Sequence, residues 1–150
     1  MTSRRLVLAT GVFDLLHYGH LRFLEESKKV GGKGARLVVL VARDATVERT
    51  KGKKPVMSEN ERRTLVASLK PVDKAVLGYR RFNIRRVIDR LKPNIITVGY
   101  DQDDVRNAVE KVVKENGLKI RIVRMRRFGR TDLYSSSKIK GRVIQNWGRL

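Results

Sequence analysis

Residues 6–20 read Leu-Val-Leu-Ala-Thr-Gly-Val-Phe-Asp-Leu-Leu-His-Tyr-Gly-His, and they combine a strand pattern, a turn and the start of a helix. The opening residues are apolar, as expected for a strand covered on both faces. His17 and His20, the two histidines of the chain, fall at the predicted helix start with Gly19 between them. A helix N-terminus offers unpaired N–H groups and a positive dipole end, so this order predicts a phosphate site beside two imidazole donors.

Beyond this segment, apolar runs alternate with helical patterns to the end of the chain. Ser58-x-x-Glu61 has the form of a capping box, Thr50–Pro55 is expected to be a loop, and Asp103 or Asp104 is expected to cap a helix. The alternation predicts an α/β fold, a Rossmann-like, doubly wound, five-stranded parallel sheet with helices on both faces, in a single domain over residues 1–150. Ligands of such sheets bind beyond the carboxyl ends of the strands. The later strands are expected at residues 37–42, 75–77, 95–98 and 120–125.

The composition favours a basic cytoplasmic protein. The chain has 35 Lys and Arg against 15 Asp and Glu, a formal net charge of +20, and no cysteine, which excludes disulfides and thiolate catalysis. No apolar run is long enough to span a membrane. Because the basic residues are spread along the whole chain, we favour a basic surface around a phosphate-binding mouth over a dedicated nucleic-acid platform. Adaptation to salt or heat is a further explanation of the charge.

The first segment resembles the signature of a known family. Gly11-x-Phe13-Asp14-x-x-His17-x-Gly19-His20 is similar to the motif of the cytidylyltransferase-like nucleotidyltransferases, which move a nucleoside monophosphate from ATP or CTP onto a phosphate. The resemblance implies that His17 and His20 are catalytic. Asp14 is expected to orient the turn by bonding backbone N–H groups. The nucleotide is expected to lie against Thr10, Gly11, Val12, Phe13 and Gly19.

A lysine cluster follows the second predicted strand. Lys51-Gly52-Lys53-Lys54 places ammonium groups around a glycine, and lysine binds phosphate as a point charge. From the residues alone, a solvated basic loop explains this segment equally well. The resemblance implies that Lys51 and Lys53 lie on the phosphates, with Lys53 in the catalytic set.

Gly99-Tyr100-Asp101 follows the predicted strand at residues 95–98. It resembles the family's glycine–acid element, which implies that Gly99 and Asp101 lie beside the ribose or the base. A helix-capping turn is the alternative.

A second motif precedes the last predicted helix. Arg130 is followed by Ser135, Ser136 and Ser137, and hydroxyls at a helix N-terminus, together with a nearby guanidinium, form an anion nest. The segment is similar to the family's second motif, which grips the β- and γ-phosphates and implies a catalytic role for Arg130. A plain serine N-cap is the alternative.

The resemblance implies in-line attack of an acceptor phosphate on the α-phosphate, with pyrophosphate leaving. We expect Mg²⁺, or another divalent cation, to be held mainly by the nucleotide, because no acidic cluster offers a protein cage. The interior, including residues 41–47 and 68–75, looks most like the archaeal FAD synthases, which transfer AMP from ATP to FMN. Val12 stands where that group usually has threonine, so the choice of base stays open. The alternative is a cytidylyltransferase or adenylyltransferase for a small phosphorylated alcohol or sugar.

A hypothesis of another class is a nucleic-acid-binding protein. Residues 79–86, Tyr-Arg-Arg-Phe-Asn-Ile-Arg-Arg, combine aromatic and basic side chains, which suits nucleic acid, the FMN phosphate and ring, or plain solvent exposure. Members of the resembled family often pair, so the resemblance also implies a homodimer.

Overall fold

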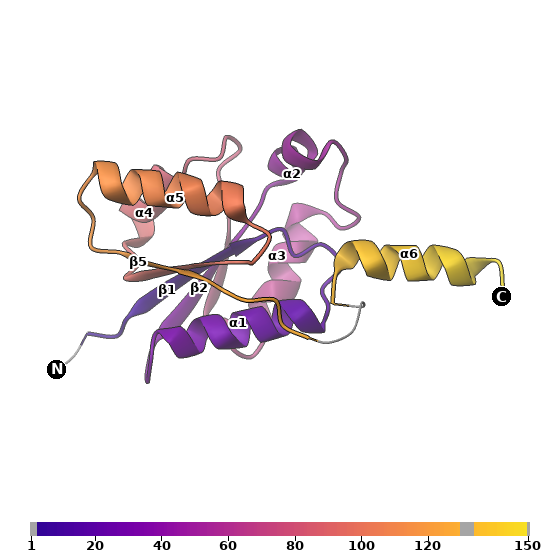
Figure 1. Ribbon diagram of the computed structural model, residues 1–150, viewed down its shortest axis with the longest axis horizontal. Helices are drawn as coiled ribbons and strands as arrows, with labels where there is room; N and C mark the ends of the chain where they lie inside the picture. Colours follow the sequence, from indigo (N-terminus) through magenta and orange to yellow (C-terminus); the bar gives the residue numbers. More distant parts are fainter. Residues whose placement is uncertain (1–2, 130–133, 150) are drawn as a thin grey trace.

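A five-stranded, all-parallel sheet in the order β3-β2-β1-β4-β5 lies at the centre of a computed structural model that describes residues 3–129 and 134–149 (Figure 1). The strand order reverses between β1 and β4, which is where ligands of such sheets bind. The predicted doubly wound fold is therefore confirmed. The strands are β1 (Leu6–Gly11), β2 (Arg36–Val41), β3 (Lys74–Leu77), β4 (Ile95–Val98) and β5 (Arg121–Arg124). The helices are α1 (Tyr18–Val30), α2 (Asp44–Lys51), α3 (Glu59–Ala67), α4 (Ile84–Leu91), α5 (Asp103–Glu115) and α6 (Ser136–Trp147).

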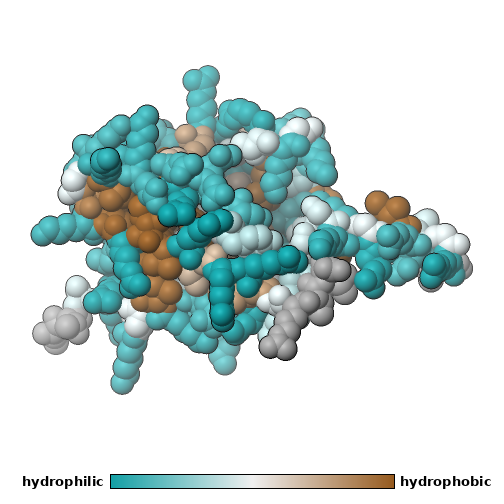
Figure 2. Space-filling view, in the orientation of Figure 1, coloured by the Kyte–Doolittle hydropathy of each residue, from teal (hydrophilic) through white to brown (hydrophobic). Residues whose placement is uncertain are grey.

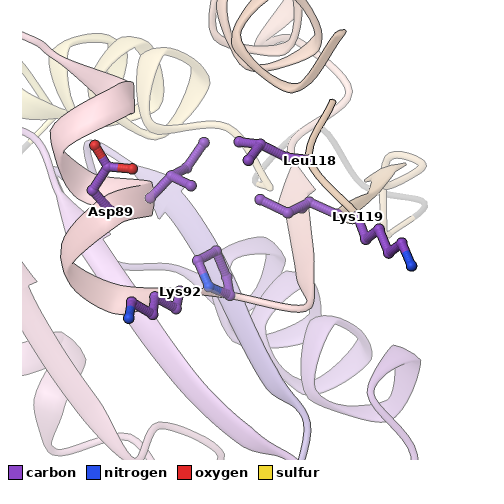
Figure 3. A pocket seen from close by; sticks show the side chains of 7 residues that line it. Asp89, Lys92, Leu118 and Lys119 are labelled. Carbon is purple, nitrogen blue, oxygen red and sulfur yellow. The ribbon is translucent and has the colours of Figure 1, made fainter. Parts of the chain in front are cut away.

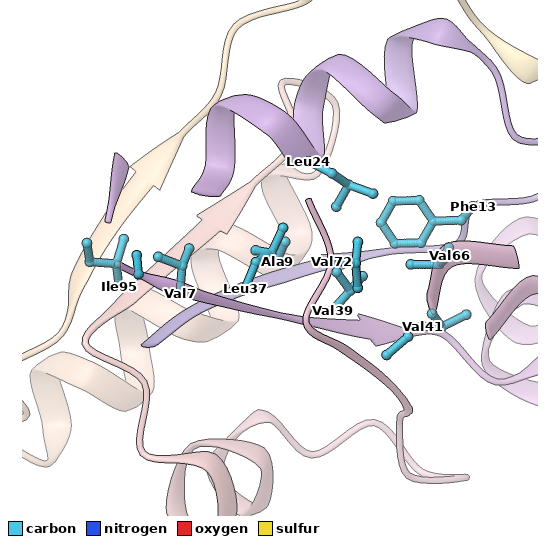
Figure 4. Packing of buried hydrophobic residues seen from close by; sticks show 12 residues of the cluster. Val7, Ala9, Phe13, Leu24, Leu37, Val39, Val41, Val66, Val72 and Ile95 are labelled. Atoms are coloured by element: carbon cyan, nitrogen blue, oxygen red, sulfur yellow. The ribbon is translucent and has the colours of Figure 1, made fainter. Parts of the chain in front are cut away.

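Two apolar layers hold the helices on the sheet. Helices α1 and α3 lie on one face, and α4 and α5 lie on the other (Figure 1). Side chains of β1 alternate between them: Val7 and Ala9 pack with Leu24 of α1 (Figure 4), whereas Leu8 packs with Val109 of α5. This alternation follows from the period of two in a strand. Because β1 is packed on both faces, the position at which the loop after it begins is fixed.

Helix α6 departs from this layered arrangement. It projects from the end of the molecule where β1 terminates (Figure 1), and none of its residues is buried. Its outer surface carries apolar patches among polar groups (Figure 2), and Trp147 is 74% exposed. The described residues include no helix with the length and apolar character that a membrane crossing requires.

Two local predictions were wrong. Thr50 and Lys51, expected in a loop, are the last residues of α2, whose single buried residue, Val47, gives too weak an apolar stripe to mark a helix. Asp103 and Asp104 lie in the first turn of α5 and do not cap it, since Gln102 is its N-cap residue. Acidic side chains in a first turn still interact favourably with the helix dipole.

Candidate active site

The segments that follow β1, β2 and β4, together with the start of α6, lie at the carboxyl edge of the sheet (Figure 1). The sequence motifs are therefore gathered at the edge where doubly wound sheets bind ligands.

The loop from β1 to α1 is held in an unusual backbone conformation. Phe13 and Leu15 have φ angles of 56° and 57°, in the left-handed region that residues with side chains rarely adopt. The Phe13 ring is buried in the core layer under α1 and α3 (Figure 4). A Cβ atom at Gly11 would lie 2.7 Å from that ring, so glycine is required there. The core thus fixes the loop that the sequence assigns to the nucleotide.

The two histidines start α1 by capping it. His17 is the N-cap residue, and its Nδ1 accepts a hydrogen bond from Gly19 N at 3.0 Å. Nδ1 of His20 accepts one from His17 N at 3.3 Å, which completes a capping box. A nitrogen that accepts carries no proton, so in each neutral ring we assign the proton to Nε2. Neither Nε2 has a hydrogen-bond partner within residues 3–129 and 134–149, which leaves two N–H donors for a ligand.

Burial keeps both rings neutral at neutral pH. Burial lowers the pKa of His20 to about 3, with further lowering by the charges of His17 and Lys51 and an opposing effect of Asp14. Burial also lowers the pKa of His17. At neutral pH both imidazoles are uncharged, and an incoming phosphate therefore meets N–H donors in place of imidazolium ions.

Gly19 is enclosed by the site. A Cβ atom on it would lie 2.9 Å from His17 Cε1 and 3.1 Å from the carbonyl oxygen of Tyr134. The space beside Gly19, where the sequence predicts a close approach of a ligand, is thus occupied in part by Tyr134, the residue before the N-cap of α6.

The Asp14 carboxylate binds backbone N–H groups, but they do not belong to its own turn. Its Oδ2 accepts from Val56 N at 2.9 Å and its Oδ1 from Met57 N at 3.0 Å, both in the segment between α2 and α3. Lys140 Nζ of α6 lies 3.3 Å from Oδ2. Burial alone would raise the pKa of Asp14, but these hydrogen bonds and the Lys140 charge lower it below its ordinary value. The carboxylate is ionised and connects three segments of the chain.

Arg62 is a site-building residue that the sequence reading missed. Its side chain is 0% exposed, and its Nη1 donates to the carbonyl oxygens of Val12 at 2.7 Å and Ala42 at 2.8 Å. Its Nε donates to the Met57 carbonyl at 3.0 Å, and its Nη2 pairs with Asp44 at 2.6 Å. Its position one helical turn before the buried Val66 places it on the inward face of α3, and this spacing could have drawn attention to it.

Of the two lysines assigned to the phosphates, Lys51 lies near enough to His20 to act on its pKa. Lys51 ends α2, and its charge acts on the pKa of His20, so this end of α2 faces the β1–α1 loop. Lys53 is exposed in the following loop, with no hydrogen bond or ion pair to another described residue.

The serine turn meets the first motif. Ser136 Oγ donates to the carbonyl oxygen of Asp14 at 2.6 Å, across 122 residues of sequence, and lies 3.3 Å from that of Leu15. Ser135 is the N-cap residue of α6, without a side-chain cap bond, and Ser137 is exposed in the first turn. One of the three expected phosphate-binding hydroxyls is thus already bonded to the protein. Arg130 lies outside the described residues.

The other predicted nucleotide contacts lie at the same edge of the sheet. Thr10 is 4% exposed, and its buried hydroxyl has no partner among the described residues. Gly99 N donates to Gln102 Oε1 at 2.7 Å, and Asp101 is exposed beyond the end of β4. The carbonyl of Val12 is held by Arg62.

Two other features lie apart from the histidine pair. A pocket of about 430 Å³ opens between the end of α4 and the segment before β5, at the amino end of the strands (Figure 3), and it contains no predicted site residue.

In the basic segment 79–86, the Arg86 guanidinium lies 4.3 Å from the centre of the half-buried Tyr79 ring, whereas Phe82 is exposed. Tyr79 is therefore already stacked within the protein.

The donor set does not form a protein metal site. Across residues 3–129 and 134–149, no three His, Cys, Asp or Glu side chains converge as a cluster that could hold a metal ion. Asp14 is an acidic residue close enough to His20 to act on its pKa. Both of its carboxylate oxygens already accept backbone N–H groups.

Comparisons with known proteins identify the family of the chain. A family model described as cytidylyltransferase-like matches residues 8–142. The chain is 45% identical to FAD synthase of Aciduliprofundum boonei over 138 residues, which are 92% of this chain and 89% of that protein. It is 44% identical to FAD synthase of Methanopyrus kandleri over 144 residues, 95% of this chain and 94% of that protein. The crystal structure of the lipopolysaccharide core biosynthesis protein from Thermoplasma volcanium has a TM-score of 0.75 and 42% identity, covering 85% of this chain and 100% of that chain. The chain belongs to the cytidylyltransferase-like family.

Proposed function

We propose that this protein is an FMN adenylyltransferase, which transfers AMP from ATP to FMN and releases pyrophosphate. Identities of 45% and 44% to FAD synthases along nearly their whole length support the substrates. One structural observation carries the reaction class: the Ser136 hydroxyl bonds the Asp14 carbonyl at 2.6 Å, so the two motifs assigned to the triphosphate lie side by side. Donors separated by more than a hundred residues can then act on one nucleotide.

The chemistry requires positioning more than proton transfer. A phosphate monoester has its second pKa near 6, so at pH 7 most of the attacking FMN phosphate is already dianionic. One of its oxygens attacks the α-phosphorus of ATP in line, a new P–O bond forms, and the bond to the bridging oxygen of pyrophosphate breaks. The electron pair of that bond leaves with pyrophosphate. A general base is therefore unnecessary, in agreement with two histidines whose Nδ1 lone pairs are already occupied by backbone N–H groups.

His17 and His20 act as hydrogen-bond donors in this mechanism. Their Nε2–H groups are fixed by the capping bonds on Nδ1, so they meet the charge that develops on the phosphate oxygens without reorganising. Gly11, Phe13 and Thr10 hold the nucleotide side of the same loop, with Val12 and Gly19.

Charge on the departing pyrophosphate is met from two sides. Lys51 and Lys53 approach from the end of α2, and Ser135, Ser136 and Ser137 offer the N-terminal turn of α6, with Arg130 before it. Gly99 and Asp101 lie on the ribose or base. A divalent cation bound mainly by the triphosphate would supply further charge neutralisation.

The same resemblance and composition support proposals for the location and the oligomeric state. We propose a cytoplasmic location, in keeping with a chain that has no cysteine and uses ATP. We also propose a homodimer, on the family resemblance.

Substrate choice is tested with purified protein, Mg²⁺ and four substrate pairs, ATP or CTP with FMN or glycerol 3-phosphate. We expect FAD and pyrophosphate from ATP and FMN, at a rate well above that of any other pair. Reaction of glycerol 3-phosphate with CTP, without FAD formation from ATP, would instead establish the alternative cytidylyltransferase.

The nucleic-acid hypothesis is tested by titrating RNA at physiological salt. We expect weak binding that falls steeply with salt, as for a basic surface, and that ATP reduces. Tight RNA binding that ATP leaves unchanged would favour a nucleic-acid protein.

A further inference from the structure

Among the described residues, Ser136 and Lys140 make polar contacts between helix α6 and the body of the protein. It has no buried residue, so apolar burial contributes little to its placement. Ser136 Oγ donates to the carbonyl oxygen of Asp14 at 2.6 Å, and Lys140 Nζ reaches the Asp14 carboxylate at 3.3 Å. These contacts lie one helical turn apart on α6 and end on one residue of the β1–α1 loop. The orientation of the first turn of α6 therefore depends on Asp14.

The same carboxylate holds the segment between α2 and α3. Its oxygens accept the N–H groups of Val56 and Met57, at 2.9 Å and 3.0 Å. That segment continues from the loop carrying Lys53, and Lys51 ends the helix before it. A single buried residue, 7% exposed, is thus bonded to both segments that we assign to the triphosphate.

The strength of the connection follows from burial. The Asp14 side chain is 9% exposed and that of Lys140 is 32% exposed, so the pair is screened less by water than a surface ion pair. The Lys140 ammonium group, beside a carboxylate that already accepts two N–H bonds, also keeps that carboxylate charged, which strengthens those bonds. Loss of Lys140 therefore affects both ends of the connection.

We propose that Lys140 and Asp14 form a positioning pair that couples the serine turn of α6 to the lysine-bearing segment between α2 and α3, so that the two sides of the triphosphate site assemble together. This inference rests on the proposed function in one respect, the identity of the ligand as ATP. The structural test, which measures the mobility of α6 without substrate, does not depend on that function. Lys140 acts through Asp14 and does not itself need to touch the nucleotide.

The first test replaces Lys140 in the full-length protein and measures ATP binding directly, along with both Michaelis constants. In Lys140→Met we expect the Kd and KM for ATP to rise about tenfold, the range of a charged hydrogen bond, while the KM for FMN changes less than twofold. Lys140→Arg should restore most of the affinity, because a guanidinium can pair with the same carboxylate. Arg142→Met removes the same charge two residues further along α6, from a side chain with no bond to a described residue, and we expect unchanged values.

The second readout uses Trp147, the only tryptophan of the chain, which lies on α6 and is 74% exposed. Its fluorescence anisotropy reports the motion of the helix without any substrate. We expect lower anisotropy in Lys140→Met than in the wild type and in Arg142→Met, at unchanged far-UV circular dichroism. Failure of FAD formation would remove the proposed function, yet leave this measurement valid for the pair.

The coupling itself is tested by a double-mutant cycle on ATP affinity with Lys53→Met, an exposed site. If Asp14 links the two segments, the factor by which Lys53→Met weakens ATP binding should be at least threefold smaller in the Lys140→Met background than in the wild type. The reason is that the segment carrying Lys53 is already less well positioned in Lys140→Met. Multiplicative effects would overturn the coupling. Unchanged ATP affinity in Lys140→Met, or a loss with unchanged Trp147 anisotropy that Lys140→Arg does not rescue, would overturn the positioning role.

Discussion

The imidazole rings of His17 and His20 stack with their centroids 3.8 Å apart and an angle of 30° between them. Each ring accepts at Nδ1 a backbone N–H group at the start of α1, from Gly19 for His17 and from the N-cap residue His17 for His20. The pair therefore enters the site as one rigid unit, and both free nitrogens belong to adjacent rings. Substitutions can separate the chemical role of this pair from its structural role.

Replacing His17 by asparagine keeps an N-cap acceptor while removing the imidazole donor. We expect His17→Asn to lower kcat about 100-fold, the range for removal of one preorganised donor, with a change in ATP affinity below threefold. Thermal unfolding checks that the helix start is retained. Unchanged turnover would contradict the donor role of His17.

The lowered pKa of His20 makes stability depend on pH. In the folded protein its pKa is about 3, below the ordinary value of 6.5, so below pH 6.5 the unfolded chain takes up a proton that the folded chain excludes. The free energy of unfolding should then fall as pH drops from 6.5 to 5, with a slope from this group approaching about 1.4 kcal/mol per pH unit. Urea titrations of the wild type and His20→Asn measure the slope. The variant should be less sensitive, and equal slopes would contradict the burial of a neutral His20.

Loss of the buried Arg62 guanidinium should be among the most destabilising single changes at the site. Arg62→Met leaves the carbonyls of Val12 and Ala42 and the Asp44 carboxylate without their partner, for which we expect a cost of about 3–5 kcal/mol in unfolding free energy. Arg62→Lys should recover only part, because one ammonium cannot reproduce four separate contacts. Denaturant titration provides the measurement. A loss below about 1 kcal/mol, the size of one ordinary hydrogen bond, would show that the network contributes little.

Two glycines provide a matched pair. In Gly19→Ala the new methyl group meets the His17 ring at 2.9 Å, so we expect a loss of about 1–3 kcal/mol in stability and lower turnover from a displaced imidazole. In Gly141→Ala, within α6, no atom lies within 4 Å of the added Cβ, and the better helix propensity of alanine should raise stability by up to about 1 kcal/mol. Equal behaviour of the two variants would contradict the enclosed position of Gly19.

The sequence predicted most of the fold because its signals are local. The apolar runs and their spacing marked all five strands, with residues 95–98 matching β4, and the Ser58 capping box marked the start of α3. Helix α2 escaped detection because DATVERTK has one buried residue and therefore no periodic stripe. A short polar helix is defined by its caps and its tertiary contacts more than by its own pattern.

The candidate site was predictable where it depends on the motif, and it was not where it depends on distant contacts. His17, His20 and Gly19 lie within one turn of chain, so their spacing placed them together. The partners of Asp14 are 42, 43 and 126 residues away, and no local pattern indicated that a motif acid bonds the α2–α3 segment and α6. Arg62 lies at helical spacing from Val66, but its four partners are set by the tertiary fold, and an arginine in a basic chain resembles the solvated ones.

Because His17 and His20 cap α1 with their own rings, the protonation state of the site is coupled to the capping of a helix. A second proton on either ring has to go onto Nδ1, and it can do so only after that nitrogen has released a main-chain amide. Acidification therefore removes the side-chain caps of α1 in the same event that charges the imidazoles, and the first turn is left with the backbone bonds that His20 N and Leu21 N donate to the His17 carbonyl.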